Sequence, residues 1–101
     1  MFVITNQLSV KPEFAEAIEK AFLENIEGIQ ALPGFQGFRF LRPLTPETTP
    51  FLVETTWADQ AAFEHWKQSD HFKQSHSGMG QFREAFYAPP KMGQYSLSHS
   101  I

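Results

Sequence analysis

FVITNQLSV, the stretch from Phe2 to Val10, alternates between apolar and polar side chains. Such alternation is typical of a strand with one buried face, because successive side chains point to opposite sides of a sheet. Asn6 interrupts the pattern, since its amide falls on the face that also carries Phe2, Ile4, Leu8 and Val10. A buried amide without hydrogen-bond partners costs about 1–3 kcal/mol. Asn6 therefore either bonds to a neighbouring loop or buried water, or serves a function.

Helical periodicity follows this strand. Pro12 suits the first turn of a helix, and apolar residues recur every three or four positions from there to Ile29. The Leu-Pro-Gly segment at 32–34 should end this helix, because neither proline nor glycine continues a helix well. Further strands are expected at Phe35–Leu41 and, after a proline-rich loop, at Phe51–Trp57.

A second helix is expected after the third strand. Asp59 is a suitable N-cap for a helix that begins at Gln60. The pair Ser69-Asp70 offers a second cap, which predicts a break in the helix at that point. We expect a short helix to continue from the break to about His76, closed by Gly78.

The order of these elements predicts the fold class. Segment 81–86 could form a helical turn, and Lys91–Ile101 should form the last strand. Strand, helix, strand, strand, helix, strand is the order of the α+β ferredoxin-like split βαββαβ unit, an antiparallel sheet with helices on one face. Some apolar residues fall out of phase with the helix-covered face, which favours packing of the other face on a second copy: Val3, Phe38, Phe40 and Leu52.

Composition limits the classes of function. The 101 residues suit a single domain, 1–101, and the net charge of -3 provides no basic surface for nucleic acid. The absence of cysteine removes disulfides, thiolate nucleophiles and Cys-ligated metals. The N-terminus lacks the features of a signal peptide, and no stretch has the length of a membrane span. These features predict a cytoplasmic protein without a nucleic-acid or membrane partner.

Both tryptophans lie within WADQAAFEHWKQSDHFKQSHSGMG, the segment from Trp57 to Gly80. Trp66 follows Phe63 by three positions, so it either packs in the core or forms the wall of a pocket for a flat aromatic ligand. Trp57, at the end of a predicted strand, is expected in the core.

The same segment holds three of the four histidines. His76 is expected near a helix C-terminus, where the dipole favours the protonated ring and competes with metal ligation. It is therefore either a surface or capping histidine, or a ligand. His65 and His71 are expected to face solvent, and the spacings of six and five residues do not place the three rings on one helix face.

The residues alone thus predict an apolar, aromatic pocket with one amide and one imidazole. A catalytic Ser-His-acid order, a phosphate loop and a dinucleotide fingerprint are all missing from the sequence. A straight helix would separate Trp66 from His76 by about 15 Å, and the break at Ser69-Asp70 could turn both toward one cavity. A ligand that touches both must be large and flat.

Three stretches resemble one known family: FVITNQLSV with Asn6, LPGF at 32–35, and VETTWADQAAFEHWKQSDHFKQSH at 53–76. They are similar to the Isd-type heme-degrading monooxygenases of the antibiotic-biosynthesis monooxygenase superfamily. The resemblance covers nearly the whole chain. It implies a ferredoxin-like fold that dimerises into an α/β barrel, with one heme per subunit between helices and sheet.

The resemblance also implies roles for individual residues. His76 matches the axial ligand of the heme iron, Asn6 the distal amide, and Trp66 the tryptophan that presses on the porphyrin and distorts it. Phe22 and Phe72 are expected to contact the heme as well. Candidates for the propionate contacts are the cations Arg39, Arg42, Lys73 and Arg83.

The implied activity is oxidative opening of the porphyrin ring, with release of iron. Heme is then both substrate and cofactor, dioxygen is the oxidant, and electrons come from an external donor or reductase, since no flavin or nicotinamide site is visible. Two alternatives remain. One is a cofactor-independent monooxygenase that oxidises a polycyclic aromatic, and the other is a non-enzymatic heme-binding protein.

Overall fold

The computed structural model describes residues 1–70, 72 and 84–101. The elements, in chain order, are the strand β1 (Phe2–Leu8), the 3₁₀ turn η1 (Pro12–Phe14), the helix α1 (Ala15–Ile29), the strands β2 (Phe35–Leu41) and β3 (Phe51–Trp57), the helix α2 (Gln60–Lys67) and the strand β4 (Lys91–Ser96). The strands form one sheet in the order β2-β3-β1-β4, and each neighbouring pair is antiparallel.

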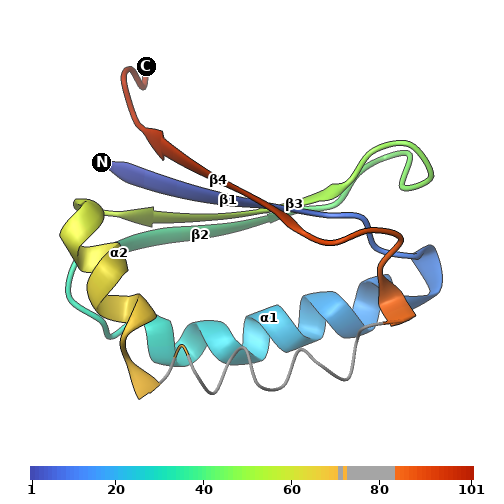
Figure 1. Ribbon diagram of the computed structural model, residues 1–101, viewed down its shortest axis with the longest axis horizontal. Helices are drawn as coiled ribbons and strands as arrows, with labels where there is room; N and C mark the ends of the chain where they lie inside the picture. The colour runs from blue at the N-terminus through green and yellow to red at the C-terminus, as the bar shows by residue number, and fades with distance from the viewer. Residues whose placement is uncertain (71, 73–83) are drawn as a thin grey trace.

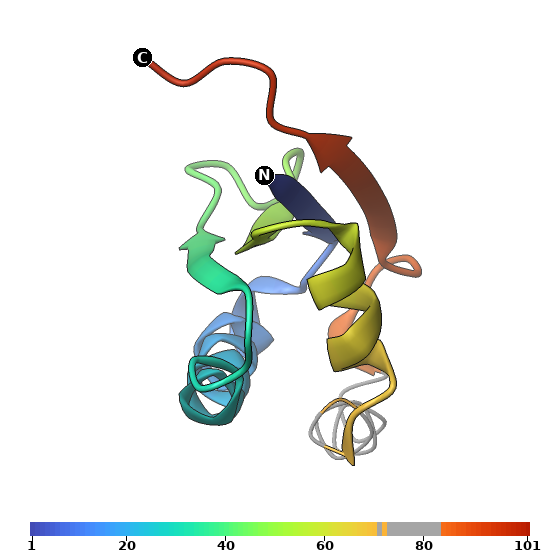
Figure 2. The same cartoon turned by 90° about the vertical axis from the view of Figure 1, so that its left-hand side faces the viewer.

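Both helices cover the same face of this sheet (Figure 1). Viewed from the side, α1 and α2 stand apart below the strands, α1 under β2 and α2 nearer β4 (Figure 2). The predicted α+β, ferredoxin-like arrangement is confirmed. Within the described residues, no helix is long and apolar enough to cross a membrane.

Local sequence explains where the helices begin and end. Pro12 opens a single 3₁₀ turn, so the α-helix proper starts at Ala15. The Asp59 carboxylate accepts a hydrogen bond from the Ala62 backbone N–H at 2.9 Å, which confirms the predicted N-cap of α2. Gly34 follows α1 with a φ of 83°, a conformation that favours glycine because it has no Cβ.

A β-bulge corrects the prediction for two phenylalanines. The register between β2 and β3 shifts between Phe35 and Gly37, so Phe35 and Phe38 both face the helices. Phe38 stands opposite Thr55 and Phe40 opposite Val53, and the Phe40 ring packs on Phe22 of α1. The prediction that Phe38 and Phe40 belong to the second face is therefore wrong, because the extra residue of the bulge reverses the alternation.

The second face of the sheet keeps a smaller apolar area. Val3 and Leu52 alternate with the helix-facing residues of their strands, and each is only half-buried. Leu41 pairs with Leu52 on the same face, and Tyr95 pairs with Val3. Dimerisation through this face stays a prediction.

The last strand is shorter than predicted. β4 ends at Ser96, opposite Phe2, and residues 97–101 are exposed. The last contact between the two segments is the hydrogen bond from the Leu97 N–H to the Met1 carbonyl (2.9 Å). The predicted strand 91–101 therefore forms only over its first six residues. The described part of the expected turn, Glu84 and Ala85, is a 3₁₀ turn next to Phe86, which bridges to Val10.

The buried apolar residues of the described part of the chain form two core clusters. One cluster joins the start of α1 to the sheet and contains Leu8, Val10, Ile18, Phe51, Val53 and Ala85. The other joins α2 and the end of α1 to the opposite end of the sheet and contains Ile4, Ile29, Trp57 and Phe63. The space between the two clusters forms the pocket described below.

Gly34 provides a test of how α2 packs. A Cβ at Gly34 would lie 2.5 Å from the Ala62 Cβ, whereas a Cβ at Gly37 would meet nothing within 4 Å. We expect Gly34→Ala to lower the free energy of unfolding by about 2 kcal/mol or more, since a left-handed conformation alone costs a non-glycine residue roughly 1–2 kcal/mol. Gly37→Ala should change it little. Urea denaturation of the two variants would contradict this account if both had the same midpoint.

Candidate functional site

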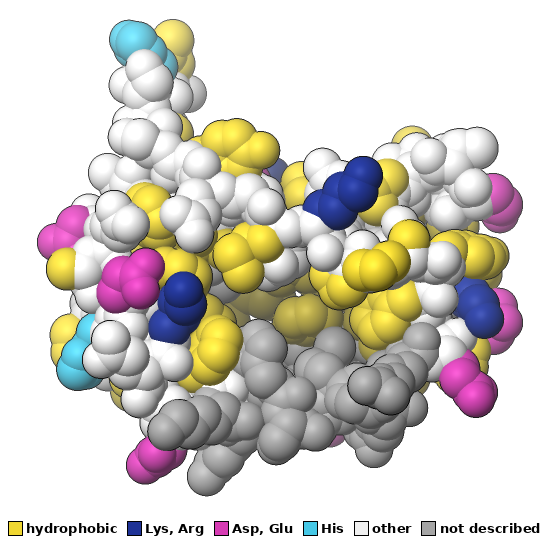
Figure 3. Space-filling model, in the orientation of Figure 1, with side chains coloured by type: hydrophobic (Ala, Val, Ile, Leu, Met, Phe, Trp, Pro, Cys, Tyr) yellow, Lys and Arg dark blue, Asp and Glu magenta, His cyan; other side chains and the backbone are white. Residues whose placement is uncertain are grey.

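A hollow opens between the two helices and the sheet (Figure 3). It contains about 770 Å³ of space free of protein atoms, counting the part open to solvent. The sheet, α1, α2 and Phe72 all contribute to its lining: Ile4, Asn6, Phe22, Asn25, Ile26, Ile29, Phe38, Val53, Thr55, Phe63, Trp66, Lys67, Phe72 and Met92. Most of these side chains are apolar, and five are aromatic.

Asn6 lies on the sheet side of this pocket. It stands opposite Val53 on β3 and Met92 on β4, and neither side chain can accept or donate a strong hydrogen bond. In the part of the chain that the structure describes, the Asn6 amide has no hydrogen-bond partner. The described residues therefore do not support the alternative in which Asn6 bonds to a neighbouring loop. The half-buried amide is available to a ligand.

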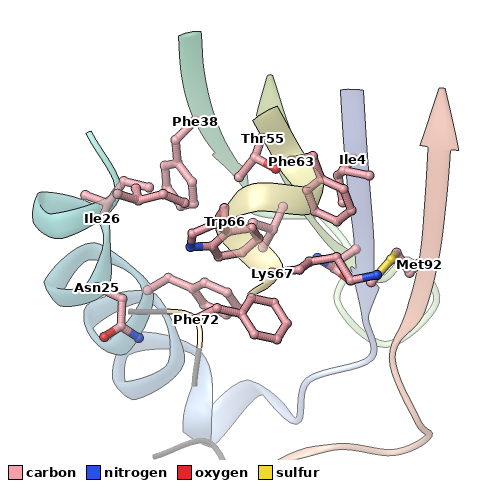
Figure 4. A pocket seen from close by; sticks show the side chains of 14 residues that line it. Ile4, Asn25, Ile26, Phe38, Thr55, Phe63, Trp66, Lys67, Phe72 and Met92 are labelled. Carbon is pink, nitrogen blue, oxygen red and sulfur yellow. The ribbon is translucent and has the colours of Figure 1, made fainter. Parts of the chain in front are cut away.

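Trp66 forms the wall of the pocket on the side of α2 (Figure 4). Its ring stacks on Trp57 with centroids 5.4 Å apart and meets Phe72 edge-on at 4.8 Å. Trp57 is completely buried, which confirms its predicted place in the core. Trp66 is only half-buried, so the same ring both packs on the core and lines the pocket.

Ser69 sets the path of the chain after α2. The helix ends at Lys67, and the Ser69 hydroxyl donates to the Trp66 carbonyl at 2.6 Å. The same oxygen accepts the Phe72 N–H at 3.2 Å, as expected for a cap at the predicted break. This pair of bonds places Phe72 beside Trp66.

Several predictions fall outside the described residues. His76, the predicted axial ligand, lies there, as do His71, Gly78 and the propionate candidates Lys73 and Arg83. Of the remaining histidines, His65 is exposed on α2, as predicted, and His99 is exposed beyond β4. Among the residues that are described, no three His, Asp or Glu side chains form a group that could hold a metal ion.

Two of the three arginines proposed near the propionates, Arg39 and Arg42, do not line the pocket. Arg39 pairs with Glu54 at 3.2 Å, and both alternate with residues that face the helices. Arg42 forms two hydrogen bonds to the Glu19 carboxylate, at 2.7 and 3.1 Å, and these lower the pKa of Glu19. Each guanidinium therefore already has an anionic partner away from the cavity.

Lys67 is instead the one charged residue in the described lining. Its ammonium lies 5.5 Å from the centre of the Phe63 ring and 3.8 Å from a Glu64 oxygen. The side chain extends from α2 toward Met92 of β4 (Figure 4). Exposed pairs such as Lys67–Glu64 are weak, so the ammonium can turn to an anionic ligand at little cost.

Sequence reasoning did not assign ten of the lining residues to the site. Five of these ten are buried or half-buried apolar residues: Ile4, Ile26, Ile29, Val53 and Phe63. The other five are Asn25, Phe38, Thr55, Lys67 and Met92. Signals existed for two of them. Lys67 follows Trp66 directly, and Asn25 is three positions after Phe22 on the same helix. The others depend on strand register, which one sequence does not specify. Of the predicted site residues, Asn6, Phe22, Trp66 and Phe72 come together in the pocket, and their roles stay predictions.

These features define an α+β domain with an aromatic ligand pocket between its sheet and its helices. Residues 1–78 match the antibiotic biosynthesis monooxygenase family, and the chain belongs to that family. Over 77 residues it is 36% identical to a staphylobilin-producing heme oxygenase of Staphylococcus haemolyticus, covering 75% of this chain and 73% of that protein.

Two solved structures share this fold. A variant of MhuD, crystallised with two manganese protoporphyrin IX molecules per active site, superposes with a TM-score of 0.81 at 22% identity, over 100% of this chain and 98% of that one. A variant of SnoaB, a cofactor-independent oxygenase from Streptomyces nogalater, gives 0.80 at 18% identity, over 99% and 95%. The backbone therefore resembles these two proteins equally well.

Proposed function

We propose that this protein is a heme-degrading monooxygenase that binds heme in the pocket, opens the porphyrin with dioxygen and external electrons, and releases iron. One observation carries the proposal: the Asn6 amide, without a described partner, and the half-buried Trp66 ring face the same apolar cavity. The identity of 36% to a heme oxygenase supports heme over other flat ligands.

The lining suits the chemistry of heme. A porphyrin is flat and apolar over most of its area and carries two carboxylates on one edge. Five aromatic side chains offer apolar contact area, and Lys67 offers a cation for a carboxylate. His76, outside the described residues, is proposed as the axial ligand. Bound heme would supply the redox chemistry that activates dioxygen.

The side chains of this protein would orient that chemistry. The Asn6 NH2 group donates hydrogen bonds from the sheet side of the cavity. Trp66, braced against Trp57 at 5.4 Å, resists displacement, so a flat ligand pressed on it must bend instead. Phe22 and Phe72 provide further apolar contacts and exclude water. In this proposal two copies join through the outer face of the sheet around Val3, Leu41 and Leu52.

A second candidate is a cofactor-independent oxygenase for a polycyclic aromatic. The similarity to SnoaB favours it, because the fold agrees as well with that protein as with MhuD. The same aromatic lining could hold either ligand. A third candidate, a heme-binding protein without activity, differs from the first only in turnover. Heme binding distinguishes the cofactor-independent oxygenase from the other two candidates. Oxidation of the bound heme distinguishes the heme-degrading monooxygenase from the heme-binding protein without activity.

Hemin titration tests the first step. We expect a Soret band with one hemin per subunit in the wild type, and loss or strong displacement of that band in His76→Ala, because the axial nitrogen is removed. His65→Ala is the matched control, since His65 is exposed on α2 and does not line the pocket. A wild-type spectrum that equals that of free hemin would exclude the leading proposal.

Turnover tests the roles of Asn6 and Trp66. With ascorbate under air, the Soret band of the wild-type complex should fade and chelatable iron should appear. Asn6→Ala should keep hemin affinity within about threefold and slow the fading of the Soret band by tenfold or more, since a distal donor acts mainly on the reaction.

Trp66→Phe should also bind hemin but degrade it more slowly, because the smaller ring distorts the porphyrin less. Asn6 and Trp66 variants with wild-type rates would remove both residues from the proposed mechanism.

Lys67 is expected to hold a ligand carboxylate. Replacing it by Met keeps the apolar stem and removes the charge, so hemin binding should weaken by about threefold, the effect of a partly exposed ion pair. Binding of hemin dimethyl ester, which has no carboxylate, should not change. Arg42→Gln serves as the control, because Arg42 pairs with Glu19 instead. Equal weakening of both ligands would indicate a packing role for Lys67.

A further inference from the structure

Thr55 is a polar pocket residue that the proposed function does not yet use. It lies on β3, on the sheet side of the cavity, with Ile4 opposite on β1 and Phe38 opposite on β2 (Figure 4). Both neighbours are apolar, so neither side chain can hydrogen-bond to the Thr55 hydroxyl. A hydroxyl in such surroundings requires an explanation.

Trp57 provides the first half of the explanation. Its indole N–H donates to the Thr55 hydroxyl oxygen at 3.1 Å. An indole nitrogen can only donate, so Thr55 must be the acceptor in this bond. Trp57 cannot turn away, because it is fully buried and its ring is packed against Phe35 at 5.4 Å and against Trp66 at 5.4 Å. The direction of the donor is therefore fixed by the core.

The hydroxyl proton of Thr55 provides the second half of the explanation. A hydroxyl carries one proton and two lone pairs, and the Trp57 bond uses a lone pair only. Among the described residues, no side chain or carbonyl accepts this proton. It is thus available to the cavity that Thr55 lines. The bond from Trp57 also restricts rotation of the hydroxyl, which leaves a donor of defined direction.

Asn6 and Thr55 lie close enough to act on one small ligand. Asn6 is opposite Val53 and Thr55 is opposite Ile4, so the two polar residues are diagonal neighbours on adjacent strands. Such pairs are separated by about 7–8 Å, a distance that a diatomic molecule or anion between the two side chains can bridge. Together they make a polar spot in an otherwise apolar part of the sheet.

We propose that Thr55 is a second hydrogen-bond donor of the site, directed at the same small oxygen-containing or anionic ligand as Asn6, and that Trp57 is the positioning residue that orients it. The inference rests on the proposed heme site, because the heme would present that ligand to the sheet. It adds a contact that Asn6 alone does not supply, and it gives the buried indole N–H of Trp57 a role in the site.

Fluoride binding to the ferric hemin complex tests the proposal without turnover. Fluoride gains strongly from hydrogen-bond donors, so Thr55→Val should weaken its binding by about fivefold to tenfold, while Thr55→Ser should restore most of it. Thr56→Val is the matched control, because Thr56 pairs with Val3 on the opposite face of the sheet. Fluoride affinity that is equal in the wild type, Thr55→Val and Thr56→Val would overturn the proposal.

A second variant tests the positioning role of Trp57, once circular dichroism and the Soret band of its hemin complex show that it folds and binds hemin like the wild type. Trp57→Phe keeps the Thr55 hydroxyl and removes the N–H that orients it, so fluoride affinity should fall by about twofold to threefold. An unchanged affinity in Trp57→Phe would remove Trp57 from the inference. A wild type without a Soret band on hemin addition would instead refute the proposed function, whereas normal hemin binding with unaltered fluoride affinities refutes only the part assigned to Thr55.

Discussion

The contact between Trp57 and the residues of α2 is the interaction on which the pocket depends. Trp57 ends β3 and is fully buried, and its ring meets Phe63 and Trp66 of α2 at 6.2 and 5.4 Å. α2 is short, so its own hydrogen bonds stabilise it little, and packing on Trp57 must hold it in place. The position of the Trp66 wall thus follows from the last residue of a strand.

The space between the two core clusters leaves room for a ligand. The cluster around Val10 and Ile18 and the cluster around Trp57 and Phe63 each close one end of the space between sheet and helices. Residues at the edges of both clusters line the cavity between them, among them Val53 and Phe63. A small domain gains most of its stability from buried apolar area, so an open middle must be balanced by dense packing at both ends.

The sequence predicts the elements better than the contacts between them. The bounds of β2 and β3, the Asp59 cap and the break at Ser69 follow from local chemistry and agree with the structure. Simple alternation places Phe38 on the wrong face, because a bulge is a property of two paired strands. Thr55 was missed for the same reason, since its neighbour Asn6 is 49 positions away in the chain and close only through the register of β1 and β3.

Lys67 and Trp66 are consecutive residues of α2, and consecutive side chains on a helix project about 100° apart. A flat ligand that lies against the Trp66 ring would therefore meet the Lys67 ammonium at its rim and not at its face. The ring fixes the plane of such a ligand, and the ammonium fixes its rotation within that plane. Two adjacent residues would thus determine which edge of an asymmetric ligand faces Asn6.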